Sequence, residues 1–299
     1  MKTLLITGLD GFTGRYLADQ ARLGGYQVVG TVHRQLVDSQ TNDELRTCDL
    51  TDANAVLELI QDVQPDAVAH LAAISFVAHG DVESVYRTNI LGTRNLLQAL
   101  AGLIKKPETV LVASSANVYG NTAGGSLDES ALPSPANDYA VSKLAMEYMA
   151  KLYTEQLPIT LVRPFNYTGV GQSDKFLLPK IVSHIRNKAP VIELGNLNVA
   201  RDFSDVRVVT AYHLKLLQNP QPSGSVFNVC SGKAHTLNDI LNLARTISGH
   251  EFEVQVNPEF VRVNEVKMLV GNKDKLDAAV GKIPTISIEE TLRWMIEAP

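Results

Sequence analysis

Residues 3–14 read TLLITGLDGFTG, an apolar run followed by three glycines spaced three residues apart. The run 3–7 is typical of a buried strand, and the residues after it predict a helix over 11–23. Gly8, Gly11 and Gly14 would allow a tight turn, and the helix N-terminus favours a negatively charged group. Because the spacing departs from the usual G-x-G-x-x-G, a purely structural turn stays open on the glycines alone. Their position favours a dinucleotide site, since doubly wound sheets bind dinucleotides at an N-terminal strand–turn–helix.

Short runs rich in Val, Ile and Leu alternate with longer segments of helical period farther along the chain. We expect strands at 27–32, 67–70, 109–113 and 160–162, and helices near 53–63, 85–103 and 138–155. This alternation predicts an α/β fold of the Rossmann type, in which a doubly wound parallel sheet carries helices on both faces.

The alternation of predicted strands and helices becomes irregular after residue 163, where prolines and glycines interrupt the chain more often. We therefore expect residues 1–163 to form a dinucleotide-binding Rossmann domain. Residues 164–299 would form mainly a smaller substrate-binding region, with some segments returning to the first domain. Thr236 and Ser287 are each followed three residues later by a carboxylate, which predicts that two late helices begin there.

The composition is that of a globular protein and argues against several classes of partner. With a formal net charge of −5, the chain has no basic field that would attract nucleic acid or an anionic membrane. No run of about 18 apolar residues occurs, so we expect no membrane span. Cys48 and Cys230 lie far apart and the histidines lack ligand spacing. We therefore expect neither a disulfide nor a metal site, and a cytoplasmic location fits best.

The end of the second predicted strand bears on the type of dinucleotide. A carboxylate there would bind ribose hydroxyls, but residues 32–34 are Val, His and Arg. Arg34 would pair with a 2′-phosphate, which favours NADP over NAD, although an exposed surface arginine is an equally good interpretation. Asp49, just before the next helix, would accept a hydrogen bond from the adenine amine or simply hold a turn.

Tyr139 and Lys143 are four residues apart on a predicted helix, so their side chains share one helical face. A free tyrosine titrates at about pH 10, so a neighbouring positive charge is needed before its hydroxyl can exchange protons near neutral pH. Ser115 follows the predicted strand 109–113, at the carboxyl edge where α/β sheets bind ligands. The three residues form a candidate catalytic set, in which Ser115 binds the substrate oxygen that exchanges a proton with Tyr139.

In this order the motifs resemble the extended short-chain dehydrogenase/reductase family of nucleotide-sugar enzymes, and the likeness covers nearly the whole chain. The matching segments are TGLDGFTG (7–14), HLAA (70–73), NILGTRNLL (89–97), SSANVYG (114–120), YAVSK (139–143), RPFNYTGVGQ (163–172), ARDFSDV (200–206) and NVCSG (228–232). Within the family the likeness is nearest to the reductases of GDP-4-keto-6-deoxy-D-mannose.

The resemblance implies two sets of binding residues. The coenzyme, NADP or NAD, would contact Gly8, Gly11, Phe12, Thr13, Gly14, Arg34, Asp49, Leu50, Leu71, Ala72, Ala73, Tyr139, Lys143 and Pro164. The sugar nucleotide would contact Ser75, Asn117, Asn166, Arg201, Arg262 and Glu265. Arg201 suits a diphosphate because its planar fork can donate to two oxygens, but a surface pair with Asp202 or Asp205 is the alternative.

The resemblance also indicates a reaction. Dehydratases of the family carry an acid pair directly after the catalytic hydroxyl residue, where this chain has Ala116 and Asn117, so we do not expect dehydration. We expect NAD(P)H-dependent reduction at C4 of a 4-keto-6-deoxy sugar linked to a nucleoside diphosphate, with GDP favoured and GDP-D-rhamnose or its C4 epimer as product. Tyr139 would protonate the new alcohol oxygen, Ser115 would steady that oxygen, and Lys143 would keep Tyr139 acidic.

Two other functions stay open. A nucleotide-sugar 4-epimerase uses the same three residues but keeps its coenzyme and returns the hydride to the opposite face of the sugar. A non-catalytic NADP-binding sensor would share the fold, although such proteins commonly lose part of the catalytic set that this chain retains. Relatives dimerise through a four-helix bundle that includes the YxxxK helix, so the resemblance further implies a homodimer.

Overall fold

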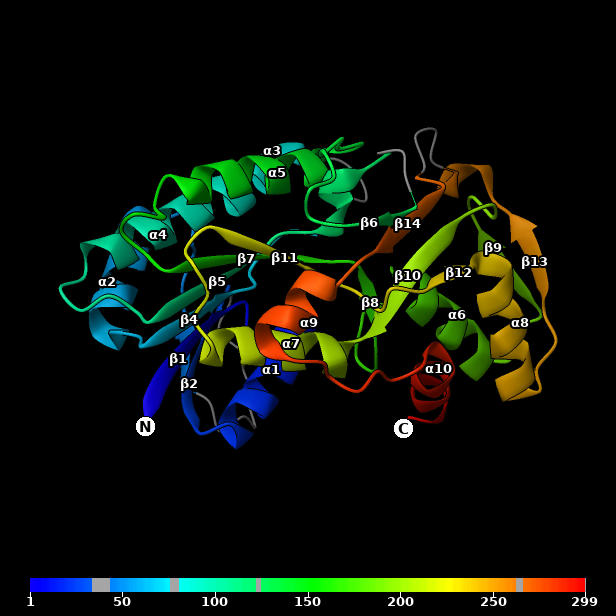
Figure 1. Cartoon of the computed structure of the whole chain (residues 1–299). Coiled ribbons are helices and arrows are strands. Elements are labelled where there is room, and N and C mark those ends of the chain that lie inside the picture. Colours follow the sequence, from blue (N-terminus) through cyan, green and yellow to red (C-terminus); the bar gives the residue numbers. More distant parts are fainter. Residues whose placement is uncertain (34–43, 76–80, 122–124, 262–265, 299) are drawn as a thin grey trace.

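The structure of the protein is a computed structural model that describes residues 1–33, 44–75, 81–121, 125–261 and 266–298 (Figure 1). Its larger sheet has seven parallel strands in the order β11–β7–β5–β4–β1–β2–β3. These strands are β1 (Lys2–Thr7), β2 (Tyr26–Val32), β3 (Glu44–Thr47), β4 (Ala67–His70), β5 (Thr109–Ala113), β7 (Ile159–Pro164) and β11 (Ser225–Val229). The strand order reverses between β1 and β4, which confirms the predicted doubly wound Rossmann fold.

Helices cover both faces of the larger sheet, as Figure 1 shows. One face carries α1 (Phe12–Leu23), α7 (Val206–Gln218) and α9 (Asp274–Val280), and the other carries α2 (Ala53–Val63), α4 (Thr93–Gly102) and α5 (Asp138–Lys151). In β1, Leu4 and Ile6 pack against the first set of helices, while Leu5 packs against the second. The strand is apolar at every central position because both of its faces are buried.

The prediction of one continuous helix over 85–103 was wrong, because the helix is interrupted. The chain forms α3 (Val82–Tyr86), then a π-helical segment, η1 (Arg87–Gly92), and only then α4. Within η1 the Asn89 side chain bonds Ile74, and the Thr93 hydroxyl donates to the Asn89 carbonyl oxygen at 2.7 Å. The Thr93 hydroxyl thus shares the Asn89 carbonyl oxygen with the helical ladder, while the loop after β4 holds the Asn89 side chain, and the π-helical turn forms where these two contacts meet.

Other boundaries also differ from the prediction. The helix expected to reach residue 155 ends at Lys151, and β7 is longer than the strand expected at 160–162. Strands β3 and β11 had no sequence signal that we recognised. Strand β3 is short and polar, while β11 follows α7 and returns to pair with β7 at the sheet edge.

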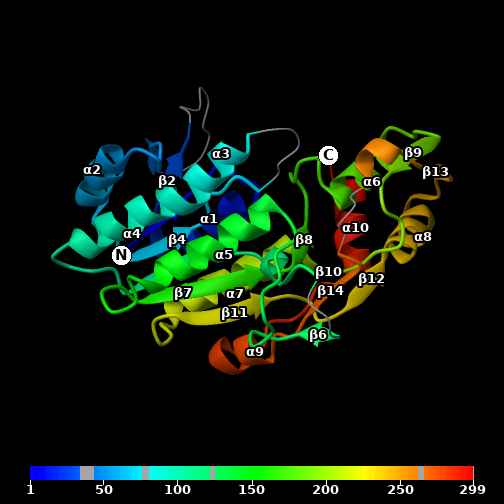
Figure 2. The same ribbon diagram turned by 90° about the horizontal axis from the view of Figure 1, so that it is seen from above.

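A second region lies beside the end of the larger sheet toward which its strands point (Figures 1 and 2). It contains a five-stranded sheet and a two-stranded one. Their strands are β6 (Ser126–Leu127), β8 (Asn166–Thr168), β9 (Val191–Leu194), β10 (Ala200–Asp205), β12 (Ala234–Thr236), β13 (Glu253–Val256) and β14 (Met268–Gly271). The accompanying helices are α6 (Leu177–Arg186), α8 (Leu237–Ser248) and α10 (Ile288–Glu297), with short 3-10 turns η2 (Ala116–Tyr119) and η3 (Pro258–Phe260).

The two late helices begin where the sequence predicted. At Thr236 and Ser287 the hydroxyl accepts from the third helical amide, while the carboxylates of Asp239 and Glu290 accept from the N-cap amides. Within the described ranges, no helix combines the length and apolar character that spanning a bilayer would require.

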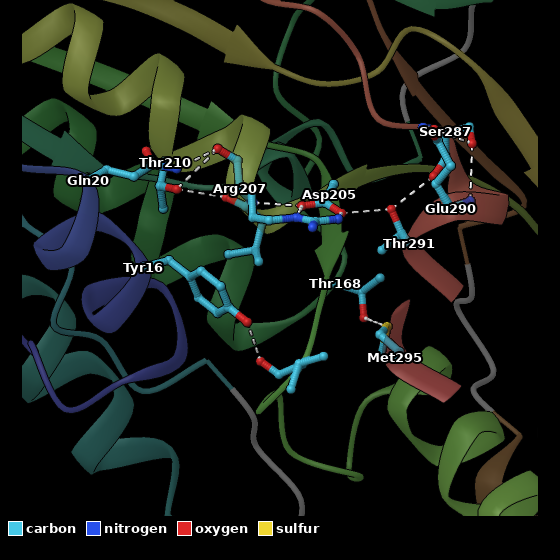
Figure 3. Close-up of polar contacts among 12 residues, drawn as sticks. Tyr16, Gln20, Thr168, Asp205, Arg207, Thr210, Ser287, Glu290, Thr291 and Met295 are labelled. Atoms are coloured by element: carbon cyan, nitrogen blue, oxygen red, sulfur yellow. Dashed lines mark hydrogen bonds and ion pairs between the residues drawn. The ribbon is translucent and has the colours of Figure 1, made fainter. Parts of the chain in front are cut away.

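A polar cluster joins the second region to α1 and α7 (Figure 3). Arg207 donates to both carboxylate oxygens of Asp205 at 2.9 and 2.7 Å, and Thr291 of α10 donates to the same carboxylate at 2.8 Å. The Arg207 guanidinium also lies 3.8 Å from the centre of the Trp294 ring. Gln20 of α1 donates to the Arg207 carbonyl oxygen at 2.9 Å, so the cluster also holds the helix that begins at the glycine turn close to the second region.

Candidate functional site

The glycine turn is packed too closely for side chains at its glycines. Gly8 has a φ of +71°, and a Cβ there would lie 2.9 Å from Ala72 Cα. A Cβ on Gly14 would lie 2.4 Å from the Gly8 carbonyl oxygen and 2.7 Å from Leu9 Cα. Gly11 is the N-cap of α1, and no side chain caps this end of the helix. The exposed backbone and the helix N-terminus therefore suit the diphosphate of a dinucleotide.

Aromatic residues connect the glycine turn to the second region. Phe12 stacks on Tyr167 of β8 with ring centres 6.0 Å apart, and the Thr13 hydroxyl lies 2.7 Å from the Tyr167 hydroxyl. The Tyr16 hydroxyl donates to the Val170 carbonyl oxygen at 2.7 Å, a bond that Figure 3 shows. Tyr167 lies inside the quoted RPFNYTGVGQ segment, but we assigned it no role there.

The loop after β4, which contains Leu71, Ala72 and Ala73, passes close to the glycine turn. The Ala72 amide donates to the Thr7 hydroxyl at 3.3 Å, which holds the loop against the end of β1. Beyond it, fully buried Asn89 accepts from the Ile74 amide at 3.0 Å and donates to the Ser142 hydroxyl of α5 at 3.0 Å. Asn89 thus connects the loop to the helix that carries Tyr139 and Lys143. The segment NILGTRNLL contained this residue, but its connecting role required the tertiary structure.

Asp49 and Leu50 lie after β3, next to the end of β2. The exposed Asp49 carboxylate accepts from the amide and hydroxyl of Thr51 at 2.9 and 2.8 Å, and these bonds lower the pKa of Asp49. Asp49 therefore holds the turn, one of the two roles expected for it. Leu50 is buried, and its carbonyl oxygen accepts from the Asn95 side chain at 2.9 Å. Arg34 lies outside the described residues.

Ser115, Tyr139 and Lys143 come together at the carboxyl end of β5. Ser115 is the N-cap of η2, Tyr139 lies in the first turn of α5, and Lys143 follows one turn later. The Ser115 side chain lies close enough to the Tyr139 hydroxyl to act on its pKa. The Lys143 ammonium donates to the Ala113 carbonyl oxygen at 2.8 Å and lies 6.0 Å from the centre of the Tyr139 ring. Pro164 ends β7, the strand next to β5.

Burial controls the protonation of this set. Removal from water raises the pKa of the half-buried Tyr139, the neighbouring Tyr167 adds to this effect, and the polar side chain of Ser115 opposes it. Burial lowers the pKa of Lys143 to about 8, and the charge of Glu147 opposes that shift. Lys143 is therefore mostly protonated at neutral pH and loses its charge in mildly alkaline solution.

A buried ion pair that we did not single out from the sequence lies next to the catalytic set. Arg163 donates to the two carboxylate oxygens of Glu147 at 2.9 and 2.7 Å, and the Ser114 hydroxyl donates to Glu147 at 2.5 Å. Arg163 also donates to the Tyr119 hydroxyl at 2.9 Å, which in turn donates to Asn228 at 2.7 Å. The available signals were the four-residue spacing of Glu147 from Lys143 and the arginine that opens RPFN.

The residues predicted to hold the sugar nucleotide are only partly brought together. Ser75 is exposed at the end of the loop after β4, and the Asn117 amide donates to the Ser115 hydroxyl at 3.2 Å. Asn166 of β8 pairs with Phe203 of β10, the strand that also carries Arg201. The two remaining predicted residues, Arg262 and Glu265, lie outside the described residues.

Arg201 donates to the carbonyl oxygens of Ala200 and Lys267 at 2.9 and 3.3 Å. The carboxylate of Asp202 accepts from the amides of Ser231 and Gly232, both at 2.8 Å, so it is occupied in holding the NVCSG loop. A cavity of about 540 Å³ lies next to Arg201, since Ala200 and Lys267, whose carbonyl oxygens Arg201 bonds, both line it. Its lining consists of residues 197–200, Thr236, Asn238, Lys267 and Met268, so it is separate from the catalytic set.

Across the described parts of the chain, no group of three or more His, Cys, Asp or Glu side chains is arranged to hold a metal ion.

The chain matches the family model described as GDP-mannose 4,6 dehydratase over residues 5–295. It is similar to the GDP-6-deoxy-D-talose 4-dehydrogenase of Aggregatibacter actinomycetemcomitans, with 34% identity over 285 residues that cover 93% of this chain and 91% of the relative. It is also 34% identical over 308 residues to the GDP-6-deoxy-D-mannose reductase of Pseudomonas aeruginosa, covering 98% of this chain and 95% of the relative.

Two solved structures extend the likeness to three dimensions. A crystal structure from Burkholderia cenocepacia, described as a candidate epimerase, has a TM-score of 0.93 at 52% identity and covers 99% of this chain and 97% of its own. The structure of RMD from Pseudomonas aeruginosa complexed with NADPH has a TM-score of 0.83 at 34% identity, covering 99% of this chain and 98% of its own. The predicted family and fold are therefore confirmed.

Proposed function

The chain belongs to the GDP-mannose 4,6-dehydratase family of extended short-chain dehydrogenases, whose members include NAD(P)-dependent enzymes, and we propose that it reduces the C4 carbonyl of a GDP-4-keto-6-deoxyhexose. The observation that carries the proposal is the gathering of Ser115, Tyr139 and Lys143 at the end of β5, where Tyr167 interacts both with Tyr139 and with Thr13 after the glycine turn. The two similar curated proteins are named for GDP-6-deoxyhexoses that differ at C4. GDP-4-keto-6-deoxy-D-mannose is therefore the proposed substrate, and GDP-D-rhamnose or its C4 epimer the product.

In this reaction the chain positions the carbonyl and supplies the proton. A bound nicotinamide coenzyme supplies the hydride. Tyr139 gives its hydroxyl proton to the C4 oxygen as the carbonyl becomes an alcohol, and Ser115 donates a hydrogen bond to the same oxygen. The Lys143 ammonium lies 6.0 Å from the centre of the Tyr139 ring, and its positive charge would favour the tyrosinate that remains.

The residues after Ser115 support reduction over dehydration. Ala116 is buried and apolar, and Asn117 is an amide, so neither can act as the acid or base that elimination of water needs. The two relatives named for oxidoreduction at a 6-deoxy sugar agree with this choice.

NADPH is the proposed reductant. No carboxylate occupies residues 32–34 after β2, where it would repel a 2′-phosphate, and the similar RMD structure is a complex with NADPH. We propose that Arg34 pairs with the 2′-phosphate and that the remaining predicted coenzyme residues line the site around the glycine turn. A KM for NADPH at least tenfold below that for NADH would support this choice, and the reverse ratio would contradict it.

For the sugar nucleotide, we propose contacts from Ser75, Asn117, Asn166, Arg201, Arg262 and Glu265. The cavity next to Arg201 lies in the second region, where residues 164–299 would bind mainly substrate while residues 1–163 bind the coenzyme. The return of β11 to the larger sheet fits a division in which some late segments belong to the first domain. An Arg201→Met variant with raised KM for the GDP-sugar and unchanged coenzyme affinity would support these contacts.

We further propose a cytoplasmic homodimer, with neither nucleic acid nor a membrane as partner. Val141, Tyr148 and Leu152 form an exposed stripe along α5 and its end, with 39%, 61% and 76% of their surface accessible. Spacing of seven and four residues puts them on one face, as a helix-bundle contact requires. Light scattering should give the mass of a dimer for the wild type and of a monomer for Tyr148→Glu. A wild-type monomer at micromolar concentration would contradict the proposal.

The proposed reaction is tested by incubating the protein with NADPH and GDP-, dTDP- or UDP-linked 4-keto-6-deoxy sugars, followed by NMR of the products. We expect NADPH consumption with the GDP-sugar, and the coupling of the H4 proton identifies the C4 configuration. Binding of NADPH without turnover of any sugar in the panel would instead indicate a non-catalytic sensor.

A nucleotide-sugar 4-epimerase is the second candidate, because the similar Burkholderia cenocepacia structure is described as a candidate epimerase. Such an enzyme would be purified with coenzyme bound and would interconvert C4 alcohols without added NADPH. Stoichiometric loss of NADPH absorbance for each sugar reduced separates the reductase from the epimerase.

A further inference from the structure

Glu147 and Arg163 form an ion pair next to Lys143 that is almost fully removed from water. Only 1% of the Glu147 surface and 6% of the Arg163 surface are accessible. Tyr139, Lys143 and Glu147 occupy successive turns of α5 at four-residue spacing, so they share one helical face. The Tyr-x-x-x-Lys motif ends at Lys143, whereas the buried polar face of α5 continues for one more turn to Glu147.

The ion pair contacts the immediate neighbours of other site residues. Glu147 accepts from the hydroxyl of Ser114, which directly precedes Ser115. Arg163 directly precedes Pro164, and its third contact is the hydroxyl of Tyr119 in η2, the turn that Ser115 caps. One ion pair therefore holds α5, the end of β5, the end of β7 and η2 together.

We propose that Glu147 and Arg163 are positioning residues for Lys143 and Ser115, and that their paired charges set the electrostatic environment of the Lys143 ammonium. The catalytic consequence rests on the proposed reduction, but the effect on Lys143 itself does not.

Charges and titratable groups facing Lys143 come from several elements. Tyr139 and Glu147 on α5 and His70 on β4 interact with Lys143 directly. Arg163 on β7 and Tyr119 on η2 lie behind Glu147, and Tyr167 on β8 acts on Tyr139. Burial, with a smaller contribution from Lys143, lowers the pKa of His70 to about 3, so this imidazole is neutral at working pH. Glu147 is the carboxylate whose charge raises the pKa of Lys143 against the effect of burial.

Opposite charges in the pair predict opposite effects of neutralising each partner. Glu147→Gln removes the negative charge and leaves the Arg163 guanidinium unbalanced, so the pKa of Lys143 should fall. Arg163→Met leaves the carboxylate unbalanced, so the pKa of Lys143 should rise. In this buried environment, where charges are weakly screened, each shift should be about one pH unit, a tenfold change in the acid dissociation constant. A residue that only stabilised the fold would not produce shifts of opposite sign.

The test is an NMR titration of the full-length chain labelled with ¹³C at the lysine Cε positions. The Lys143 signal is identified by its absence in Lys143→Met. Asp205→Asn is the matched control, because Asp205 is also a buried carboxylate that accepts two hydrogen bonds from one arginine. It lies in the separate polar cluster of Figure 3. This variant should leave the Lys143 titration within about 0.3 pH units of wild type. If Arg163→Met does not fold, Arg163→Gln retains donors to Glu147 and carries the same expected direction.

A second measurement follows the pH dependence of kcat with NADPH and the GDP-ketosugar. In the proposed reduction, the alkaline limb should move in the same direction as the NMR titration in both variants. If the wild type reduces no ketosugar, the proposed function fails while the NMR result still decides the role of the ion pair. Shifts of the same sign, or of less than about 0.3 pH units in both variants, would overturn the inference.

Discussion

Gly14→Ala is a direct test of the glycine turn as a coenzyme site. The added Cβ would lie 2.4 Å from the Gly8 carbonyl oxygen and 2.7 Å from Leu9 Cα, whereas ordinary contact begins at 3.4 Å. Both neighbours are backbone atoms, so α1 must move by about 1 Å away from the turn. Overpacking of this kind costs about 1–3 kcal/mol, partly offset by the better helix propensity of alanine, about 1 kcal/mol. The net expectation is a loss of up to about 2 kcal/mol in the free energy of unfolding.

The Gly14→Ala substitution should also weaken the binding of NADPH. The diphosphate would have to be held by the N-terminus of α1, and a displacement of about 1 Å lengthens each amide contact. We expect the Kd for NADPH, measured by fluorescence titration, to rise at least about tenfold, or ~1.4 kcal/mol. Urea unfolding followed by circular dichroism measures the loss of stability.

Gly102→Ala is the matched control, because Gly102 is the last residue of α4 and nothing lies within 4 Å of an added Cβ. This variant should bind NADPH like the wild type and be at least as stable. If Gly14→Ala also binds NADPH within about twofold of wild type and unfolds at the same urea concentration, the packing argument for the turn is wrong.

Three further predictions concern catalysis, pH and helix capping. Tyr139→Phe removes the donated proton but keeps the ring, so kcat for the ketosugar should fall by about 10²–10⁴-fold. Near-wild-type turnover would reject Tyr139 as the proton donor. Burial lowers the pKa of His213 to about 4 and, with help from Lys143, that of His70 to about 3. Below about pH 6.5 the unfolded chain therefore binds more protons than the folded chain. The free energy of unfolding should decrease by up to about 1.4 kcal/mol per pH unit for each histidine, until the pH reaches the folded-state pKa of that histidine. Urea unfolding at pH 7 and pH 5 measures this loss, and equal stability at the two pH values would contradict it. Thr236→Ala removes the hydroxyl that accepts from the Asp239 amide at 3.1 Å, so the unfolding free energy should fall by about 0.5–2 kcal/mol. An unchanged urea midpoint would show that the cap contributes nothing.

Local signals in the sequence were sufficient for much of the fold. The apolar run before Gly8, the glycines themselves and the carboxylates after Thr236 and Ser287 act on residues within one or two turns of themselves. Such features leave a readable pattern because the interacting groups are neighbours in the chain. The YxxxK spacing belongs to the same class, since one turn of helix brings Tyr139 and Lys143 onto one face.

Features that depend on distant contacts were not readable in this way. The polar segment of β3 and the late strand β11 become strands because an existing sheet offers them hydrogen bonds. The π-helical turn at Asn89 depends on a loop from β4 that bonds its side chain.

By itself the sequence determined the family, the doubly wound sheet and the residues most suited to exchange a proton. Only the tertiary structure decided what surrounds them. Arg163 bonds Glu147 because β7 packs against α5, and Tyr119 bonds Asn228 although the two are 109 residues apart in sequence. Burial of Lys143, which lowers its pKa to about 8, likewise arises from packing by several elements. Charge and desolvation act through space rather than along the chain, so the identity of the candidate catalytic groups can be predicted from sequence while their protonation cannot.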